Sequence, residues 1–189
     1  MRISVILWTY NRCQTLPNAL SSVAASNLPE SVEWEVLVLD NNSRDQTREV
    51  MEDFCRRYPS RIRYLFEPRQ EKSHALNAGV REARGQVLAF VDDDVTGEPS
   101  WLHNLTAPLK DAQWAGTGGR TLLQRGFSPP PWLGLREPYN LGEPLPDLIW
   151  VKNHLSSPGL RPEPIWPFAG RCFRNTVASE RTWAGGQAA

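Results

Sequence analysis

The first 119 residues of the chain alternate between short apolar runs and segments whose apolar residues recur at helical spacing. The apolar runs, rich in β-branched residues, occupy residues 3–8, 35–39, 62–66 and 87–91. Such dense runs are typical of strands buried on both faces. The segments of helical period fall at residues 16–25, 43–58, 73–83 and 101–109. A strand followed by a helix, repeated in this way, predicts an α/β fold whose parallel strands are joined by right-handed crossovers.

Local signals predict where two of these helices begin or end. Ser43 and Gln46 stand at capping-box spacing, so the second helix is expected to begin just after Ser43. Gly85 follows the third helical segment and is expected to close it.

The chain changes character after residue 119. Ten of its 16 prolines lie between Pro129 and Pro167, together with several tryptophans. Because proline fixes φ and lacks a backbone donor, this part is expected to contain neither long helices nor central strands. A disordered linker would rarely carry so many tryptophans, so the segment is interpreted as an ordered, loop-rich cover over one side of the sheet.

Charge and cysteine usage exclude several classes of protein. The 21 Lys and Arg residues balance the 21 Asp and Glu residues, so no net positive field attracts nucleic acid or an anionic membrane. The three cysteines are widely spaced, which fits neither a disulfide framework nor a C-x-x-C metal site. No apolar run approaches the roughly 20 residues that cross a bilayer, and no secretion signal is recognisable. A reduced, cytoplasmic setting is expected.

Three carboxylates, Asp92, Asp93 and Asp94, directly follow the fourth predicted strand. They repel one another unless a cation offsets their charge. Oxygen-only ligands favour Mg²⁺ or Mn²⁺ over zinc. Alternation along the strand places Asp92 and Asp94 on one side and Asp93 on the other, so the first pair could share one metal ion. The alternative is an acidic turn ahead of the next helix.

Other polar residues follow the first two predicted strands, at the edge where open parallel sheets bind ligands. The loop after the first strand offers the Tyr10 ring for stacking on a base and the Arg12 guanidinium for a phosphate. Asp40, after the second strand, could accept hydrogen bonds from a uracil imide or from ribose hydroxyls. The alternatives are a polar connecting loop in the first case and an Asx turn in the second.

Lys72 lies just before the third predicted helix. Its charge and the free N–H groups of the helix start both favour an anion at this place. The alternative is an ordinary solvated lysine.

Taken in order, these segments resemble the family 2 glycosyltransferases of the GT-A fold. The matching segments read ISVILWTYNR at 3–12, WEVLVLDNNS at 34–43, KSHALNAG at 72–79 and VDDDV at 91–95. The likeness covers about residues 2–119, and a looser likeness at 118–133 points to a bacterial branch. The resemblance implies a Rossmann-like sandwich, in which helices flank a central, mostly parallel sheet, followed by an irregular C-terminal part rich in Pro and Trp.

The resemblance also implies a role for the matching residues. It assigns donor binding to Thr9, Tyr10, Asn11, Arg12, Asp40, Lys72, Asp92 and Asp93. Of these, Lys72 would lie near the phosphates of the nucleotide. Asp92 and Asp94 would hold a Mg²⁺ or Mn²⁺ ion.

The activity implied is metal-dependent transfer of a sugar, with inversion, from a nucleotide-sugar donor to an acceptor hydroxyl. A UDP-sugar is the expected donor, a saccharide or lipid-linked molecule the expected acceptor, and nucleic acid is not expected as a partner. A cytoplasmic location is expected, with peripheral association at the inner face of the membrane left open. The acceptor needs a carboxylate base. Glu143, Asp147 and Glu163 do not stand in the family's Glu-Asp element, so no base is assigned.

We therefore expect one GT-A-like domain over residues 1–189. It would comprise a nucleotide-sugar-binding half (1–119), a partial acceptor half (120–174) and an aberrant tail (175–189). The tail lacks an apolar period, and its residues 178–187 resemble the family only in another reading frame, which predicts truncation or a frameshift. A truncated, inactive nucleotide-sugar-binding module is the alternative function. A nucleotidyltransferase is disfavoured because no Gly-rich loop follows the first strand.

Overall fold

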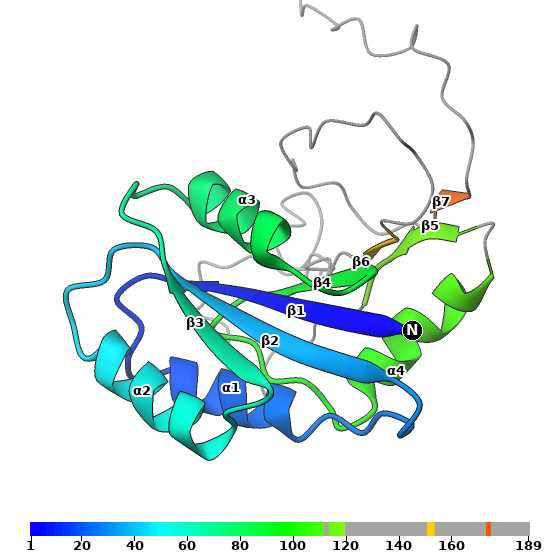
Figure 1. Ribbon diagram of the computed structural model, residues 1–189, viewed down its shortest axis with the longest axis horizontal. Coiled ribbons are helices and arrows are strands. Elements are labelled where there is room, and N and C mark those ends of the chain that lie inside the picture. The colour runs from blue at the N-terminus through cyan, green and yellow to red at the C-terminus, as the bar shows by residue number, and fades with distance from the viewer. Residues whose placement is uncertain (112–113, 120–150, 154–172, 175–189) are drawn as a thin grey trace, which may run out of the picture.

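The structure is a computed structural model that describes residues 1–111, 114–119, 151–153 and 173–174. Its strands are β1 (Arg2–Thr9), β2 (Glu33–Asp40), β3 (Ile62–Phe66), β4 (Val87–Val91), β5 (Trp114–Thr117), β6 (Val151–Asn153) and β7 (Phe173–Arg174). Its helices are α1 (Leu16–Ala24), α2 (Thr47–Arg57), α3 (Lys72–Glu82), α4 (Trp101–Thr106) and a short 3-10 helix, η1 (Ala107–Lys110). The strand–helix alternation predicted for the first 119 residues is confirmed (Figure 1).

The strands form one sheet in the order β3-β2-β1-β4-β6-β5-β7. β1 is central and pairs in parallel with both β2 and β4, so that Leu7 lies between Val38 and Val91. β3 extends the parallel part beside β2, whereas β6 runs antiparallel to β4. The expected central, mostly parallel sheet is therefore present.

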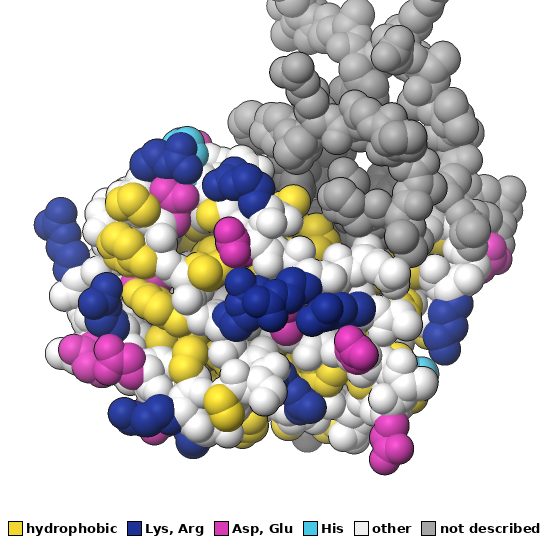
Figure 2. All heavy atoms as spheres, viewed as in Figure 1, with side chains coloured by type: hydrophobic (Ala, Val, Ile, Leu, Met, Phe, Trp, Pro, Cys, Tyr) yellow, Lys and Arg dark blue, Asp and Glu magenta, His cyan; other side chains and the backbone are white. Residues whose placement is uncertain are grey.

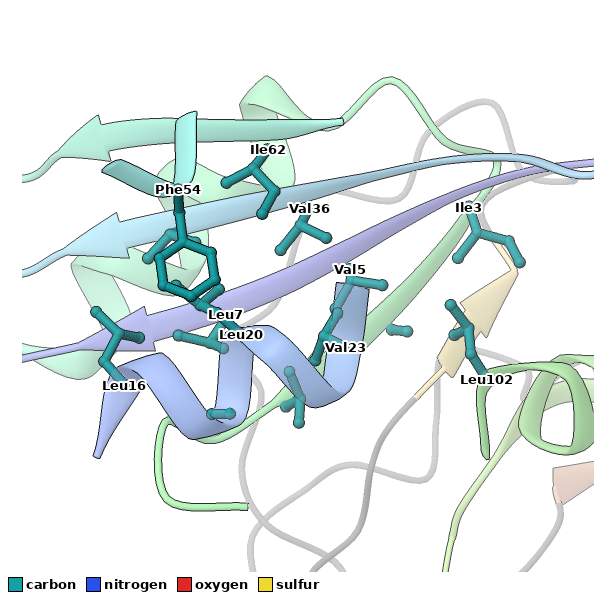
Figure 3. Close-up of a cluster of buried hydrophobic side chains, with 14 of the residues drawn as sticks. Ile3, Val5, Leu7, Leu16, Leu20, Val23, Val36, Phe54, Ile62 and Leu102 are labelled. Atoms are coloured by element: carbon teal, nitrogen blue, oxygen red, sulfur yellow. The ribbon is translucent and has the colours of Figure 1, made fainter. Parts of the chain in front are cut away.

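Helices cover both faces of this sheet, with α3 on one side and α1, α2 and α4 on the other (Figure 1). The second face carries the larger core, in which side chains of α1, α2 and α4 pack against β1 and its neighbours (Figure 3). Ile3, Val5 and Leu7 of β1 belong to this core, whereas Ile6 points to the smaller core under α3. The odd and even positions of β1 thus serve opposite layers, as a strand's alternation requires.

Helix α3 lies very close to the sheet. A Cβ at Gly79 would lie 2.8 Å from Ile6 Cγ2 and 3.0 Å from Leu39 Cδ2. The missing side chain therefore lets α3 approach β1 and β2 closely. This approach holds the first residue of α3, Lys72, near the carboxyl ends of the strands.

The predicted capping box is wrong. Helix α2 begins at Thr47, and Asp45 accepts hydrogen bonds from its backbone N–H, at 3.0 Å, and from its hydroxyl. Ser43 is engaged elsewhere, because its N–H bonds to Asp40 Oδ1 and its Oγ accepts the N–H of Asn11. Ser43 thus links the loop after β2 to the loop after β1. Asp45, rather than Ser43, accepts the hydrogen bonds at the start of α2.

Gly85 does not close α3, which ends at Glu82 and is followed by an extended Ala83. Instead, Gly85 lies against β1, where its N–H donates to Ser4 Oγ at 2.8 Å. A Cβ at this position would lie 2.7 Å from the backbone carbonyl carbon of Ile3, so a close approach between two backbones requires the glycine.

One expectation for the proline-rich part is also wrong, because β6 lies inside the sheet, between β4 and β5. No proline falls between Pro146 and Pro158, so these three strand residues keep their backbone donors. The remaining residues of the predicted loop-rich cover lie outside the described part of the chain. The division at residues 119 and 174 therefore stays a prediction.

The surface carries both charges, in keeping with the balanced composition. Figure 2 shows Lys and Arg side chains interspersed with Asp and Glu side chains on one face of the molecule. Among the described residues, no helix has the length and hydrophobicity that crossing a membrane requires.

Candidate functional site

The carboxyl ends of β1, β2 and β4 bring three polar loops together. Thr9 is paired in register with Asp40, and Leu7 with Val91, directly before the acidic turn 92–94. Lys72, at the start of α3, reaches the same edge and contacts Asp92. The expectation that these polar residues meet at one edge of the sheet is therefore confirmed.

The first two carboxylates of the acidic turn point to opposite faces of the sheet. Trp8 Nε1 donates to Asp92 Oδ1 at 2.7 Å, and Thr9 Oγ donates to Asp93 Oδ2 at 2.6 Å. Trp8 and Thr9 are consecutive residues of β1, so they face opposite layers. The predicted separation of Asp92 from Asp93 is confirmed, and Asp94 is exposed to solvent.

Thr9 and Asp93 lie beneath the surface. Thr9 is fully buried and Asp93 is only 4% exposed. Burial raises the pKa of Asp93, although the hydrogen bond from Thr9 acts in the opposite direction. Both residues were assigned to donor binding by resemblance, and the structure places their side chains against each other, where they support the turn from inside.

Asp92 is partly exposed and is paired with a lysine. Its side chain is 41% exposed, and Lys72 Nζ lies 3.1 Å from its Oδ1. The Lys72 ammonium also lies 4.5 Å from the centre of the Trp8 ring. Lys72 is therefore ion-paired, although about half of its side chain remains exposed to solvent. Trp8 was not assigned to the site from the sequence. Leu7 is paired with Val91, so the next residue of β1, Trp8, is expected beside Asp92 once this register is known.

Asp40 is held in a buried turn. It is 2% exposed, and its Oδ1 accepts the N–H of Ser43 at 2.9 Å. Its Oδ2 accepts the hydroxyl of Tyr64 at 2.6 Å. Burial, together with the charge of Asp40, raises the pKa of Tyr64 to about 12. Each oxygen of Asp40 keeps a further lone pair, but almost none of the residue is exposed to solvent. Tyr64 was not predicted from the sequence.

The loop after β1 is fastened to the loop after β2. Asn11 adopts a left-handed conformation with φ of 52°, donates its N–H to Ser43 Oγ and accepts the N–H of Arg44 on its Oδ1. Tyr10 is half-buried and Arg12 is exposed at the same place. These bonds leave the ring of Tyr10 and the guanidinium of Arg12 on a rigid loop, as a binding surface requires.

A second clamp fixes the segment that leads into α3. Asn41 is buried, and its side-chain amide donates to the backbone carbonyl of Arg69 at 2.7 Å. Glu67 accepts both the backbone N–H and the Nε of Arg69, and these hydrogen bonds lower the pKa of Glu67 to about 2. Asn41, Glu67 and Arg69 were not assigned to the site from the sequence, yet they help to set the position at which Lys72 begins its helix.

The donor set of the acidic turn suits a hard divalent cation. Within the described residues, no group of three or more His, Cys, Asp or Glu side chains could hold a metal ion on its own. Mg²⁺ commonly takes only one or two protein carboxylates and completes its shell with water and substrate phosphates. Asp92 and Asp94 are the two carboxylates of the turn that solvent reaches.

Comparison with known proteins decides the family. The family model described as glycosyl transferase family 2 matches residues 4–157. The chain belongs to this family.

Two relatives illustrate how far the similarity extends. The chain is 36% identical over 117 residues to the glycosyltransferase AglE of Haloferax volcanii, covering 61% of this chain and 36% of AglE. It is 29% identical over 122 residues to a dolichol-phosphate mannosyltransferase of Pyrococcus furiosus, covering 64% of this chain and 33% of that enzyme. The chain thus spans about a third of the length of these curated relatives.

Solved structures give the same fold. The mannosyltransferase PcManGT of Pyrobaculum calidifontis, in complex with GDP-Man and Mn²⁺, matches 60% of this chain and 34% of its own, with 26% identity and a TM-score of 0.57. TarS 1–349 of S. aureus, in complex with UDP, matches 82% of this chain and 47% of its own, with 21% identity and a TM-score of 0.63. The predicted GT-A fold of this family 2 glycosyltransferase domain is confirmed.

Proposed function

We propose that this chain binds a nucleotide-sugar and transfers its sugar, with inversion and with the help of a divalent cation, to an acceptor hydroxyl. The observation that carries the proposal is the exposed Asp92 carboxylate at the carboxyl edge of the sheet, with the Lys72 ammonium 3.1 Å away. Support comes from the GDP-Man and Mn²⁺ in the PcManGT structure and from UDP-GlcNAc in a TarS structure. A UDP-sugar is the donor we propose to test first.

The described residues suggest how the donor would lie. Tyr10 and Asn11, on the rigid loop after β1, would contact the base, and Asp40 would accept a hydrogen bond on a remaining lone pair. Lys72 would face the phosphates, where a cation and the free N–H groups of the α3 start both favour negative charge. Asp92 and Asp94 would hold Mg²⁺ or Mn²⁺.

The proposed reaction is a single displacement at the anomeric carbon. The bound cation would stabilise the charge that develops on the departing diphosphate. Lys72, whose ammonium lies 3.1 Å from Asp92 Oδ1, would also offset that charge. The acceptor hydroxyl must lose a proton to a carboxylate on the opposite face of the sugar. Glu143, Asp147 and Glu163 lie outside the described residues, so the base stays unassigned.

Calorimetry on the full chain tests metal-dependent nucleotide binding, which an active glycosyltransferase and an inactive nucleotide-sugar-binding module would share. UDP and GDP are titrated with and without Mn²⁺, and we expect binding that requires the metal. D92N should abolish the metal dependence. D53N is the matched control, because Asp53 lies on α2 in local ion pairs with Arg56 and Arg57. Binding that is indifferent to Mn²⁺, or D92N behaving like D53N, would contradict the proposal.

Donor turnover then separates the remaining alternatives. Release of nucleoside diphosphate from a UDP-sugar, with or without an added saccharide or lipid-linked acceptor, indicates a glycosyltransferase. Metal-dependent binding without turnover indicates a nucleotide-sugar-binding module. Consumption of a nucleoside triphosphate with a sugar phosphate indicates a nucleotidyltransferase. A cytoplasmic location and peripheral membrane association stay predictions, which fractionation of cells would test.

A further inference from the structure

Trp8 occupies a special place at the end of β1. It lies on the α3 side of the sheet and packs against the smaller core that includes Ile6 and Leu88. Its indole N–H points to the acidic turn and donates to Asp92 Oδ1 at 2.7 Å. Packing alone would be served by any aromatic side chain, whereas this contact needs a ring that carries an N–H donor.

Lys72 joins the same two residues. Its ammonium lies 3.1 Å from Asp92 Oδ1 and 4.5 Å from the centre of the Trp8 ring. A cation over an indole face is attracted by the ring's electrons, and hydrogen bonds to a carboxylate are stronger than those between neutral groups. Each of these three side chains therefore contacts the other two. We call Trp8, Lys72 and Asp92 the Trp8 cluster.

Both donors of the Trp8 cluster fall on the same carboxylate oxygen. A carboxylate oxygen has about two lone-pair positions, so the indole and the ammonium together saturate Oδ1. The other oxygen, Oδ2, is the one that keeps its full capacity to accept a ligand. The two contacts also restrict rotation of the Asp92 side chain, which a solvent-exposed aspartate would otherwise have.

We propose that Trp8 is a positioning residue of the donor site. Its N–H fixes Asp92 so that Oδ2 is offered to the divalent cation, and its ring keeps the Lys72 ammonium beside the place of the phosphates. This inference rests on the proposed function. Partners that orient a metal-binding carboxylate commonly change metal affinity 10- to 100-fold when they are removed.

The test compares two tryptophan variants of the full chain. W8F keeps an aromatic ring but removes the N–H bonded to Asp92. W101F is the matched control, because Trp101 Nε1 donates to Ser26 Oγ at 2.8 Å, in a contact that does not involve the acidic turn. Mn²⁺ is titrated by calorimetry in saturating UDP. We expect W8F to weaken Mn²⁺ binding about tenfold and W101F to leave it unchanged within the error of the measurement.

Tryptophan emission supplies a second readout, whose first part uses the wild-type chain alone. Mn²⁺ is paramagnetic and quenches a nearby indole, whereas Mg²⁺ does not. In wild type with UDP, Mn²⁺ should quench part of the emission that Mg²⁺ leaves intact, and this difference should persist in W101F and disappear in W8F.

The outcomes separate this inference from the proposed function. If the wild-type chain shows no metal-dependent nucleotide binding, both fail. If wild type binds metal and nucleotide but W8F binds Mn²⁺ as tightly as wild type, or if Mn²⁺ and Mg²⁺ affect the wild-type emission equally, only the role of Trp8 fails.

Discussion

Thr9 and Asp93 share a buried hydrogen bond, 2.6 Å from Oγ to Oδ2, that joins the end of β1 to the turn after β4. Trp8, one residue earlier, binds Asp92 on the other face of the sheet. Consecutive residues of β1 therefore donate hydrogen bonds to the acidic turn on opposite faces of the sheet. In this run of three carboxylates, one is buried and the other two are at least partly exposed to solvent.

The Thr9–Asp93 bond leads to a prediction about stability. T9V should lower the free energy of unfolding by about 1–3 kcal/mol, because it leaves a buried carboxylate without its donor. D93N should cost less, since an amide oxygen can still accept from Thr9 and the buried charge is removed. Urea unfolding of wild type, T9V and D93N is the measurement. If T9V unfolds at the same urea concentration as wild type, the bond contributes nothing to stability.

Asp45 predicts how stability depends on pH. Burial alone would raise its pKa, but hydrogen bonds from Thr47 and Cys13 lower it to about 2, from an unperturbed value of 3.8. A carboxyl with a depressed folded-state pKa stabilises the protein above its unfolded pKa, and this contribution disappears as the pH falls toward the folded value. Part of the stability of this chain should therefore be lost between about pH 4 and pH 2.

D45N should flatten that part of the profile. The variant has no carboxyl to titrate, so its stability is lower at neutral pH and changes less between pH 4 and pH 2 than that of wild type. Thermal unfolding across this range is the measurement, and D53N, a substitution on the exposed side of α2, is the control. A D45N profile parallel to that of wild type would show that Asp45 does not contribute in this way.

Much of this fold could be predicted because hydrophobic period is a local property. Each of the first four strands has its own apolar run, and each of the first four helices has apolar residues at helical spacing. The order and type of these elements therefore follow without knowledge of which elements pack together. The start of α2 could not be predicted in the same way. Ser43 has the right spacing for a cap, but Asn11, distant in sequence, engages its Oγ. A short central strand among prolines, β6, likewise depends on partners that local sequence does not reveal.

The site shows the same limit. Position after a strand was enough to predict that Asp40 and Asp92 meet at one edge, whereas only the family resemblance predicted that Lys72 lies near the same ligand. The contacts of Trp8 and Tyr64 with these carboxylates depend on the register between parallel strands and on strand faces, which a sequence without a known pairing does not define. Such residues are read as ordinary strand residues until the pairing is known.

Tyr64 provides a prediction at Asp40. Y64F removes the hydroxyl that donates to Asp40 Oδ2 and should lower the free energy of unfolding by about 1.5–3 kcal/mol, as expected for a hydrogen bond to a charged group. The variant should also weaken nucleoside binding if Asp40 contacts the nucleoside, since the carboxylate is then less restrained. Y58F, a substitution at the end of α2, is the control. Unchanged unfolding in Y64F would show that the bond is of no consequence.

A variant of Lys72 should distinguish contacts to the phosphates of the ligand from contacts to its nucleoside. Its side chain is 49% exposed, and its ammonium has the Asp92 carboxylate as its ion-pair partner. K72M keeps much of the apolar stem but removes the charge, which lies 4.5 Å from the centre of the Trp8 ring. If Lys72 meets the phosphates, K72M should weaken UDP binding about tenfold, the size of one charge-assisted contact, while uridine binding stays the same. Calorimetry with UDP and uridine, at two salt concentrations, is the measurement, and K110M in η1 is the control.

The UDP effect should shrink at the higher salt concentration, because added ions screen an exposed charge. Equal losses for UDP and uridine would instead place Lys72 at the nucleoside or in the fold, and an unchanged UDP affinity would remove it from the site.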